Sequence, residues 1–392
     1  MYSKIIVFFL LILLGVVLKK KFDGKSERFG IKSFILNISL PATIFISFVS
    51  IQLNPDFIVL PIIGILFNFF ILLLSPFVLK LTGLHSDYKK SRTLLLLLPS
   101  FAPGISCFPI IEEFLGSEYL VKASFLDFGN KLFVLVFLLG LSFHLHRSTQ
   151  GIKKRKNKIS IKSILKNIFL EPINAVLAIS IIMLSFGFNI NDIPAIITDF
   201  ISRLKDTLTP LVLIFVGLSI IFAKQALREI IPLLFIRAGI SLFLIGLIGT
   251  FTDLGGINDS TFYVILSLSS VSFWPFAHMT LIDKIEKNAK FKERTFDIQF
   301  GLNFLAYSLP FSTIFILLFL SNSEKLVNVS SLFMLSLIMI VVGFLIMWMS
   351  SKPIQDKKVN LAERKKTGFK ICTVHITCYI ITYFLGVFIF TH

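Results

Sequence analysis

The sequence has few charged residues and very little cysteine. Asp, Glu, Lys and Arg make up 16% of its 392 residues, whereas a soluble globular chain carries about 25%. The three cysteines, Cys107, Cys372 and Cys378, lie in apolar stretches, and the pair Cys372 and Cys378 has only His375, and no carboxylate, near it to complete a metal site. The composition therefore excludes a disulfide-stapled domain and a cysteine-based metal centre, and we predict no bound metal.

The sequence also lacks the short motifs of common enzyme active sites. It has no Gly-rich phosphate loop followed by Lys and Ser or Thr, no paired aspartate motif and no His-Glu-x-x-His zinc motif. His144 and His146 have no carboxylate three or four residues further on. We therefore predict a protein that is not an enzyme and uses no cofactor, with a polytopic membrane transferase as the enzyme alternative.

Apolar residues are abundant: 55% of the chain, with a mean hydropathy of +0.87. This surplus is too large for the cores of soluble domains, and runs of about 17–25 apolar residues, enough to cross a bilayer, recur along the chain. The sequence thus predicts an all-α polytopic membrane protein. We place its twelve spans at 3–18, 30–51, 56–79, 92–115, 119–143, 167–187, 208–223, 230–251, 261–282, 296–320, 329–350 and 371–391.

The formal charge of +17 is unevenly distributed. Alternate loops hold 32 of the 39 basic residues, which by the positive-inside rule makes those loops cytoplasmic and leaves both termini outside. Such a charge in a soluble protein would suggest a nucleic-acid partner; here we predict none and expect the loops to contact membrane lipid. The predicted location is the plasma membrane, or the inner membrane of a bacterium.

An internal repeat is indicated by landmark residues that recur at offsets of 166 to 170. The pairs are Pro41 and Pro210, Asn68 and Arg237, Pro109 and Pro275, and Asp127 and Asp297. A unit of five helices must be inverted in its second copy, an arrangement found in secondary transporters. We therefore predict a first five-helix repeat at 1–145, a basic cytoplasmic loop at 146–166, a second, inverted repeat at 167–322 and an additional transmembrane hairpin at 323–392.

Two predicted spans contain helix breakers at matching positions of the repeats. The fourth has Pro99, Pro103, Gly104 and Pro109 within eleven residues, and in the ninth four serines precede Pro275. Irregular backbone inside a membrane is tolerated only where it is buried in protein or lines a wet cavity. Half-helices that begin at such breaks aim positive N-terminal ends at the membrane centre. This predicts an anion site where the two helices cross; the alternative is that the prolines only kink packed helices.

At these residues the sequence resembles the auxin efflux carrier family of PIN-like permeases, in the group that includes the bile-acid sodium symporters. The resemblance lies in Leu40-Pro41-Ala42 within 36–45, Glu171-Pro172-Ile173, Thr209-Pro210-Leu211, and Gly104 with Pro109, while Ala102 and Cys107 replace the family's Asn and second Gly. It implies a ten-helix core with broken crossover helices 4 and 9. It also implies a scaffold of helices 1, 2, 6 and 7, a mobile transport domain, often a homodimer, and organic anions such as carboxylates as substrates.

The candidate substrate-binding residues lie in the second-helix signature and around the two breaks. They are Asn37, Pro103, Gly104, Ser106, Pro109, Ser272, Pro275 and His278. His278 could titrate near neutrality and contact a proton or an anion. The alternative for His278 is a packed, hydrogen-bonded residue.

Ionisable residues inside the spans form a second group of candidates, because a charge is costly there. Asp127 and Lys131 share a helix face and either couple transport to an ion or neutralise each other. Asp297, with Asn303 nearby, is either a coupling residue or an interfacial one, and Arg237 is a counter-charge or a packing residue.

The sequence as a whole predicts a secondary transporter that moves a small organic anion, a carboxylate by expectation, by alternating access. The coupling ion is left open between a proton and sodium. The alternative is a PIN-like module that senses a lipid or small molecule without transporting it.

Overall fold

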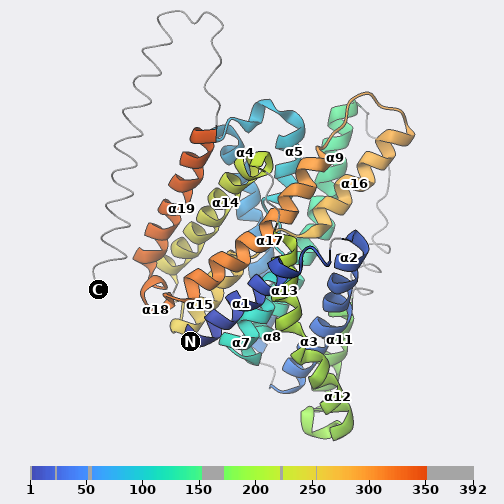
Figure 1. Cartoon of the computed structure of the whole chain (residues 1–392), viewed down its shortest axis with the longest axis vertical. Helices are drawn as coiled ribbons and strands as arrows, with labels where there is room; N and C mark the ends of the chain where they lie inside the picture. Colours follow the sequence, from blue (N-terminus) through green and yellow to red (C-terminus); the bar gives the residue numbers. More distant parts are fainter. Residues whose placement is uncertain are drawn as a thin grey trace, which may run out of the picture.

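The computed structural model is a bundle of helices (Figure 1), described here for residues 2–22, 24–51, 55–151, 172–220, 224–252 and 254–350, which contain no strand. The first half of the chain contributes α1 (Tyr2–Leu18), α2 (Lys25–Phe34), η1 (Ile35–Ser39), α3 (Leu40–Val49), η2 (Pro55–Val59), α4 (Leu60–Leu81), η3 (Leu84–Ser86), α5 (Tyr88–Leu97), α6 (Pro103–Ser106), α7 (Phe108–Phe114), α8 (Ser117–Leu132), η4 (Phe133–Leu138) and α9 (Leu139–Gln150). The second half contributes α11 (Pro172–Ser185), η5 (Ile190–Asp192), α12 (Ala195–Asp206), α13 (Leu208–Ser219), α14 (Lys224–Phe251), α15 (Ile257–Ser267), α16 (Phe273–Asn288), α17 (Ile298–Leu320), α18 (Ser323–Leu326) and α19 (Val329–Ser350).

Six unbroken helical stretches are long and apolar enough to cross a membrane. They are Ser26–Val49, Asp56–Leu81, Ser117–Gln150, Arg228–Phe251, Ile298–Leu320 and Val329–Met349. The helices α1 and α11 are apolar but shorter. The chain is therefore a multi-pass helical membrane protein, as predicted.

The predicted spans correspond to these helices with small shifts at their ends. The fourth and ninth spans are interrupted, and the predicted span at 371–391 and most of the loop at 146–166 lie outside the described residues. The number of twelve spans stays a prediction.

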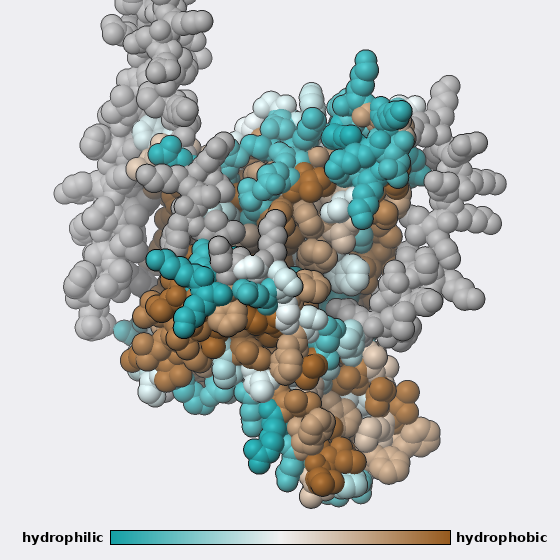
Figure 2. Space-filling model, turned by 45° about the vertical axis from the view of Figure 1, so that its right-hand side comes forward, coloured by the Kyte–Doolittle hydropathy of each residue, from teal (hydrophilic) through white to brown (hydrophobic). Residues whose placement is uncertain are grey.

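The exposed apolar side chains fit a surface in contact with lipid. Figure 2 shows apolar residues across the middle of one face of the bundle and hydrophilic residues gathered toward its upper end. Leu10 of α1, Leu73 of α4 and Leu337 of α19 are among the exposed apolar residues. A soluble protein would not leave so many large apolar side chains uncovered on neighbouring helices.

Glycines let several helix pairs approach closely. The helices α1 and α13 contact each other through Gly15 and Gly217: a Cβ added at either glycine would lie 2.1 Å from a carbonyl oxygen of the other helix. The helices α4 and α8 meet in the same way, because a Cβ at Gly129 would lie 1.9 Å from the Pro61 carbonyl oxygen. Small residues at such contacts are typical of helix packing in membranes.

The helix α19, the first part of the predicted C-terminal hairpin, packs along α14. A Cβ at Gly343 would lie 2.7 Å from the Pro232 carbonyl oxygen, and one at Gly239 would lie 2.8 Å from the Ser336 carbonyl oxygen. The Ser336 hydroxyl also donates to the Gly239 carbonyl over 2.8 Å. The added helix is therefore fixed to the helix that carries Arg237.

The elements that were not predicted from the sequence include two π-helical segments and one additional helix. Two π-helical segments, η1 and η4, precede Leu40 and follow Lys131 respectively. A third element, α12, lies between the predicted sixth and seventh spans, with Ile196 and Phe200 exposed. The segment η4 joins α8 to α9 in one continuous helical stretch from Ser117 to Gln150.

Candidate functional site

Both predicted breaks are present in the structure. The first lies between α5, which ends at Leu97, and α6, which begins at Pro103 and is followed by α7. The second lies between α15, which ends at Ser267, and α16, which begins at Phe273. Pro103 is the first residue of its helix, where a missing N–H costs no hydrogen bond.

The two breaks contact each other, and we call residues 98–107 and 268–272 together the crossover. The Ala102 N–H donates to the Ser270 carbonyl over 2.8 Å, and the Ser270 N–H donates to the Ser106 hydroxyl oxygen over 3.0 Å. Ser106 in turn donates to the Ala102 carbonyl over 2.9 Å. Each break thus satisfies backbone groups that the other has freed, which buried backbone requires.

Arg237 on α14 binds the carbonyl ends of both interrupted helices. Its guanidinium donates to the carbonyls of Leu98 (3.1 Å), Ser100 (2.8 Å) and Ser269 (2.8 Å). It also lies 4.2 Å from the centre of the Phe101 ring, a cation–π contact. The residue is only 4% exposed and forms no ion pair with a carboxylate of the described residues.

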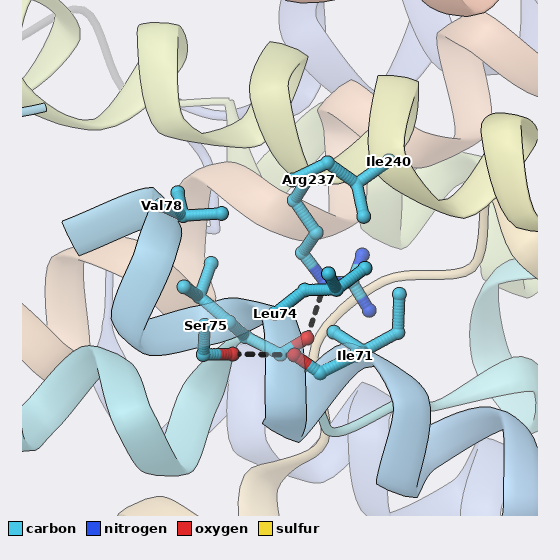
Figure 3. A pocket seen from close by; sticks show the side chains of 7 residues that line it. Ile71, Leu74, Ser75, Val78, Arg237 and Ile240 are labelled. Carbon is cyan, nitrogen blue, oxygen red and sulfur yellow. Dashed lines mark hydrogen bonds between the residues drawn. The ribbon is translucent and has the colours of Figure 1, made fainter. Parts of the chain in front are cut away.

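A small cavity lies beside the Arg237 side chain. Figure 3 shows Arg237 extending from α14 toward Ile71 and Leu74 of α4. The cavity measures about 10 Å³ and so has room for one water molecule. Arg237 is therefore walled in by protein and is not open to a larger ligand in this conformation.

A buried cluster on α8 holds the first break from the other side. The Asn130 amide donates to the Phe101 carbonyl (2.7 Å) and to Asp127 Oδ1 (3.0 Å), and Asn130 Oδ1 accepts from the Phe101 N–H (3.3 Å) and from Asn68 (2.8 Å). Lys131 Nζ lies 3.3 Å from Asp127 Oδ2 and 3.3 Å from Asn174 Oδ1 on α11. The predicted pair of Asp127 and Lys131 is therefore present, buried, and linked to the crossover through Asn130.

Asn130 is the residue of this site that sequence reasoning missed. It follows Asp127 by three residues and shares its helix face. A buried amide in an apolar helix is a recognisable sign of interhelical hydrogen bonding. Its partner Phe101, however, offers only backbone groups, which no side-chain pattern in the sequence reveals.

The remaining candidate residues lie in varied surroundings. Ser272 caps α16, because its hydroxyl accepts from the Trp274 N–H over 3.4 Å. His278, six residues further along α16, is 6% exposed, and its Nδ1 has no hydrogen-bond partner in the part of the chain that the structure describes. Gly104 approaches the second-helix signature, since a Cβ there would lie 3.3 Å from the Leu40 side chain. Pro109 and Pro275 are buried near the starts of α7 and α16.

Asp297, Asn303 and Asn37 make hydrogen bonds within their own segments. Asp297 is the N-cap of α17, where its carboxylate accepts from the Phe300 N–H over 2.9 Å, so it lies at the helix start and not within the span. Asn303 accepts from Gln299, four residues earlier. Asn37 is exposed and donates to the Ser33 carbonyl over 2.8 Å. Within the described residues, none of these three side chains forms a hydrogen bond with the crossover.

His146 has a carboxylate partner after all, from a distant part of the chain. Its Nδ1 lies 2.8 Å from Glu286 Oε1 on α16, and Glu286 also accepts from the Thr295 hydroxyl and from Gln150 (3.2 Å). Both His146 and Glu286 are buried. The search for a carboxylate at i+3 or i+4 therefore missed this contact, which joins the ends of α9 and α16.

A cleft of about 560 Å³ adjoins the crossover between α4, α8, α14 and α15. Most of its lining is apolar, and its polar members are Asn68, Asp127, Asn130, Thr252, Ser267 and Ser269, with Tyr263 at one wall. Among the predicted residues, Pro103 and Asp127 line this cleft, whereas Gly104, Ser106, Ser272 and His278 do not. The predicted residues are thus divided between those that line the cleft and those that do not.

Comparison with known proteins gives one informative similarity. No protein-family model matches the chain. A protein of Methanocaldococcus jannaschii, named uncharacterized transporter MJ1031, is 29% identical over 223 residues, which cover 55% of this chain and 68% of the relative. The chain is therefore a multi-pass helical membrane protein with two interrupted, crossing helices that is similar to a protein named a transporter.

Proposed function

We propose that this protein is a secondary transporter of the PIN-like type that moves a small organic anion by alternating access. The observation that carries the proposal is the crossover, where two interrupted helices share hydrogen bonds at Ala102, Ser106 and Ser270. Discontinuous helices that meet inside a membrane bundle are where secondary transporters bind substrate. The similarity to a named transporter agrees with this function.

The charges around the crossover favour an anionic substrate. Among the buried ionisable residues near it, Asp127 and Lys131 balance each other, whereas Arg237 has only neutral carbonyl partners. By binding the carbonyl ends of α5 and α15, Arg237 also offsets the negative ends of those helices. Asp127, Lys131 and Arg237 together carry one positive charge, and a carboxylate held near the crossover would lower the cost of burying it.

His278 is the side chain we propose to meet the substrate. It lies on α16, six residues beyond the Ser272 cap, and its buried Nδ1 has an unused hydrogen-bonding position. A buried polar atom without a partner costs about 1–3 kcal/mol, so a ligand oxygen that reached Nδ1 would gain that amount. Ser272, Gly104 and Ser106 would surround the same side of the crossover.

The pairing of the outer helices supports an inverted repeat with a separate scaffold. Helix α1 packs on α13, and α11 packs on α3, so the first helix of each half contacts the second helix of the other. This reciprocal pattern is what a two-fold relation between the halves requires. In the proposed mechanism α1, α3, α11 and α13 stay fixed while the crossover moves against them, with a proton or sodium coupled at Asp127. Asp297 and Asn303 remain weaker coupling candidates.

The proposal includes the location of the protein, its orientation and its oligomeric state. The charge distribution supports a plasma-membrane or inner-membrane location with both termini outside, and the homodimer implied by the family resemblance remains a proposal.

Counterflow of labelled mono- and dicarboxylates in proteoliposomes tests the function. Wild-type protein should give saturable flux, and His278→Ala and Asp127→Asn should each lower it by about tenfold or more, since a hydrogen bond to a charged group contributes about 1.5–3 kcal/mol. His144→Ala is the matched control, because His144 is an exposed histidine on α9.

Two results would replace the transporter with one of the alternatives. Saturable binding without flux would favour a sensor, and turnover of a lipid-linked donor in detergent would favour a transferase. Flux that is independent of both proton and sodium gradients would exclude the coupling role of Asp127.

A further inference from the structure

The cleft beside the crossover opens toward the hydrocarbon of the membrane. Its rim includes Leu66 and Phe70 of α4 and Leu247 and Phe251 of α14, which are exposed apolar side chains on two membrane-spanning stretches. Water inside so apolar a space would lack hydrogen-bond partners. Whatever fills the cleft therefore comes from the bilayer and is itself largely hydrocarbon.

The inner end of the cleft is polar, which sets it apart from an ordinary gap between lipid-facing helices. Asp127, Asn130 and Ser269 lie there beside Phe101 of the first break. Ser269 is fully buried, and its hydroxyl has no hydrogen-bond partner among the described residues. Buried hydroxyls are nearly always hydrogen-bonded, so this unused hydroxyl indicates a ligand that reaches it.

The size and lining are those of a ligand site. The volume of about 560 Å³ lies within the range of about 300–1,000 Å³ that small-molecule sites occupy, and an apolar wall with a few polar groups is their usual lining. A site of this shape takes an elongated molecule with its apolar part toward α4 and α14 and its polar end at Ser269.

We propose that the cleft binds a single-chain amphiphile drawn from the bilayer, a hydrocarbon chain that ends in an uncharged hydroxyl-bearing head. The head is uncharged for two reasons. An anionic head would approach the carboxylate of Asp127, and a cationic head would compete with Lys131, which already lies 3.3 Å from that carboxylate. A hydroxyl can both donate to and accept from Ser269 without either conflict.

This site is distinct from the proposed substrate contact at His278, although Pro103 and the proposed coupling residue Asp127 also line the cleft. None of Gly104, Ser106, Ser272 and His278 lines the cleft. The inference stands whether or not the protein moves an anion, so the flux assay and the binding assay fail independently.

Photolabelling tests the site. The full-length protein in liposomes is exposed to hexadecanol that carries a diazirine at the end of its chain, and labelled peptides of α4 and α14 are quantified. We expect saturable labelling at cleft residues, with unlabelled hexadecanol competing about tenfold better than hexadecanoate or hexadecylamine, since charged heads are costly there. Better competition by either charged compound would overturn the assignment of the head.

Matched variants test the two ends of the cleft. Ser269→Ala should weaken half-saturation about 2- to 10-fold, the effect of one hydrogen bond. Ser267→Ala should leave it unchanged, because the Ser267 hydroxyl already donates to the Val264 carbonyl over 2.8 Å.

A second pair of variants tests the rim of the cleft. Leu66→Trp should block labelling, whereas Leu73→Trp, at an exposed position of α4 outside the cleft, should not. Labelling that does not saturate, or that survives Leu66→Trp, would show that the cleft is only part of the lipid boundary. No labelling of cleft residues would show that the cleft is covered, by residues 371–391 or by a second copy of the chain. Each of these results overturns the proposal.

Discussion

At both helix breaks, backbone groups lose their helical hydrogen bonds, and different groups satisfy them at each break. The first break, between α5 and α6, contains several prolines and is held by long side chains from other helices, Arg237 of α14 and Asn130 of α8. The second break, between α15 and α16, is rich in serine; besides its contact with Arg237, it is held by serine hydroxyls and by backbone groups of the first break. The Val271 N–H donates to the Ser308 hydroxyl over 3.3 Å, and Ser270 bonds with the first break itself.

The difference shows that the second break depends on the first. The Ser269 carbonyl accepts from Arg237, and Ser270 bonds with Ala102 and Ser106 of the first break, whereas the Ser269 N–H donates to the Leu266 carbonyl of its own segment. The first break in addition has Asn130, which satisfies both backbone groups of Phe101. Loss of the first break's partners should therefore disturb both breaks, whereas loss of Ser308 should disturb only the second.

The largest effect is expected for Arg237→Met, which keeps the apolar stem but leaves three buried carbonyls without donors. We expect a loss of about 3–5 kcal/mol of unfolding free energy, from a penalty of about 1–3 kcal/mol for each unsatisfied group. Unfolding by SDS in mixed micelles measures it. Arg237→Lys should recover only part of the loss, because an ammonium cannot span three carbonyls. If Arg237→Met and Arg237→Lys were equally stable, the three carbonyl hydrogen bonds of Arg237 would not be what holds the two breaks.

Asn130→Leu should come next, with a loss of about 2–3 kcal/mol, because both backbone groups of Phe101 lose their partner. The same unfolding assay applies. Asn37→Leu is the control: Asn37 is exposed and, among the described residues, bonds to Ser33, one turn away, so the change should stay within about 0.5 kcal/mol. A tolerated Asn130→Leu would mean that the first break is held by Arg237 alone.

Ser106→Ala removes the hydroxyl that joins the two breaks and should cost about 1–2 kcal/mol. The lost groups are the acceptor of the Ser270 N–H and the donor to the Ala102 carbonyl. Hydrogen exchange should show faster exchange at Ser270 than in the wild type. Unchanged exchange at Ser270 would show that the Ser106 hydroxyl does not join the two breaks.

Ser308→Ala should have the smallest effect, about 1 kcal/mol or less, in line with the modest value of single hydrogen bonds between membrane helices. Exchange should increase at Val271 and not at Ala102. Ser321→Ala is the control, since the Ser321 hydroxyl donates to the Leu318 carbonyl and accepts from the Asn322 amide, both local contacts at the end of α17. Faster exchange at Ala102 would show that the dependence also runs from the second break to the first.

The sequence predicted where the helices break but not what holds the breaks. Prolines and serines act locally, so Pro103 and the run before Pro275 sufficed to locate the interruptions. The partners of Arg237 lie 32, 137 and 139 residues away, and they are carbonyls, which every residue possesses. Neither hydropathy nor spacing could therefore identify them.

For the span at 329–350, the sequence likewise predicted the helix but not the helix it packs against. Its bounds agree with α19, because a long apolar run determines length. Its neighbour α14 could not be derived from hydropathy, which is alike on all sides of such a helix. Gly239 and Gly343, at the close contact, are the signal that could have indicated it.

The π-helical segment η4 sets the phase of a long helix. It lies between Asp127 and Lys131, which face the crossover region, and His146, which faces Glu286. A π turn holds one residue more than an α turn, and each residue advances the helix by about 100°. Deleting one residue from Phe133–Leu138 would leave two intact lengths of helix out of phase by about that angle. His146 and Asp127 could then no longer meet their partners at the same time.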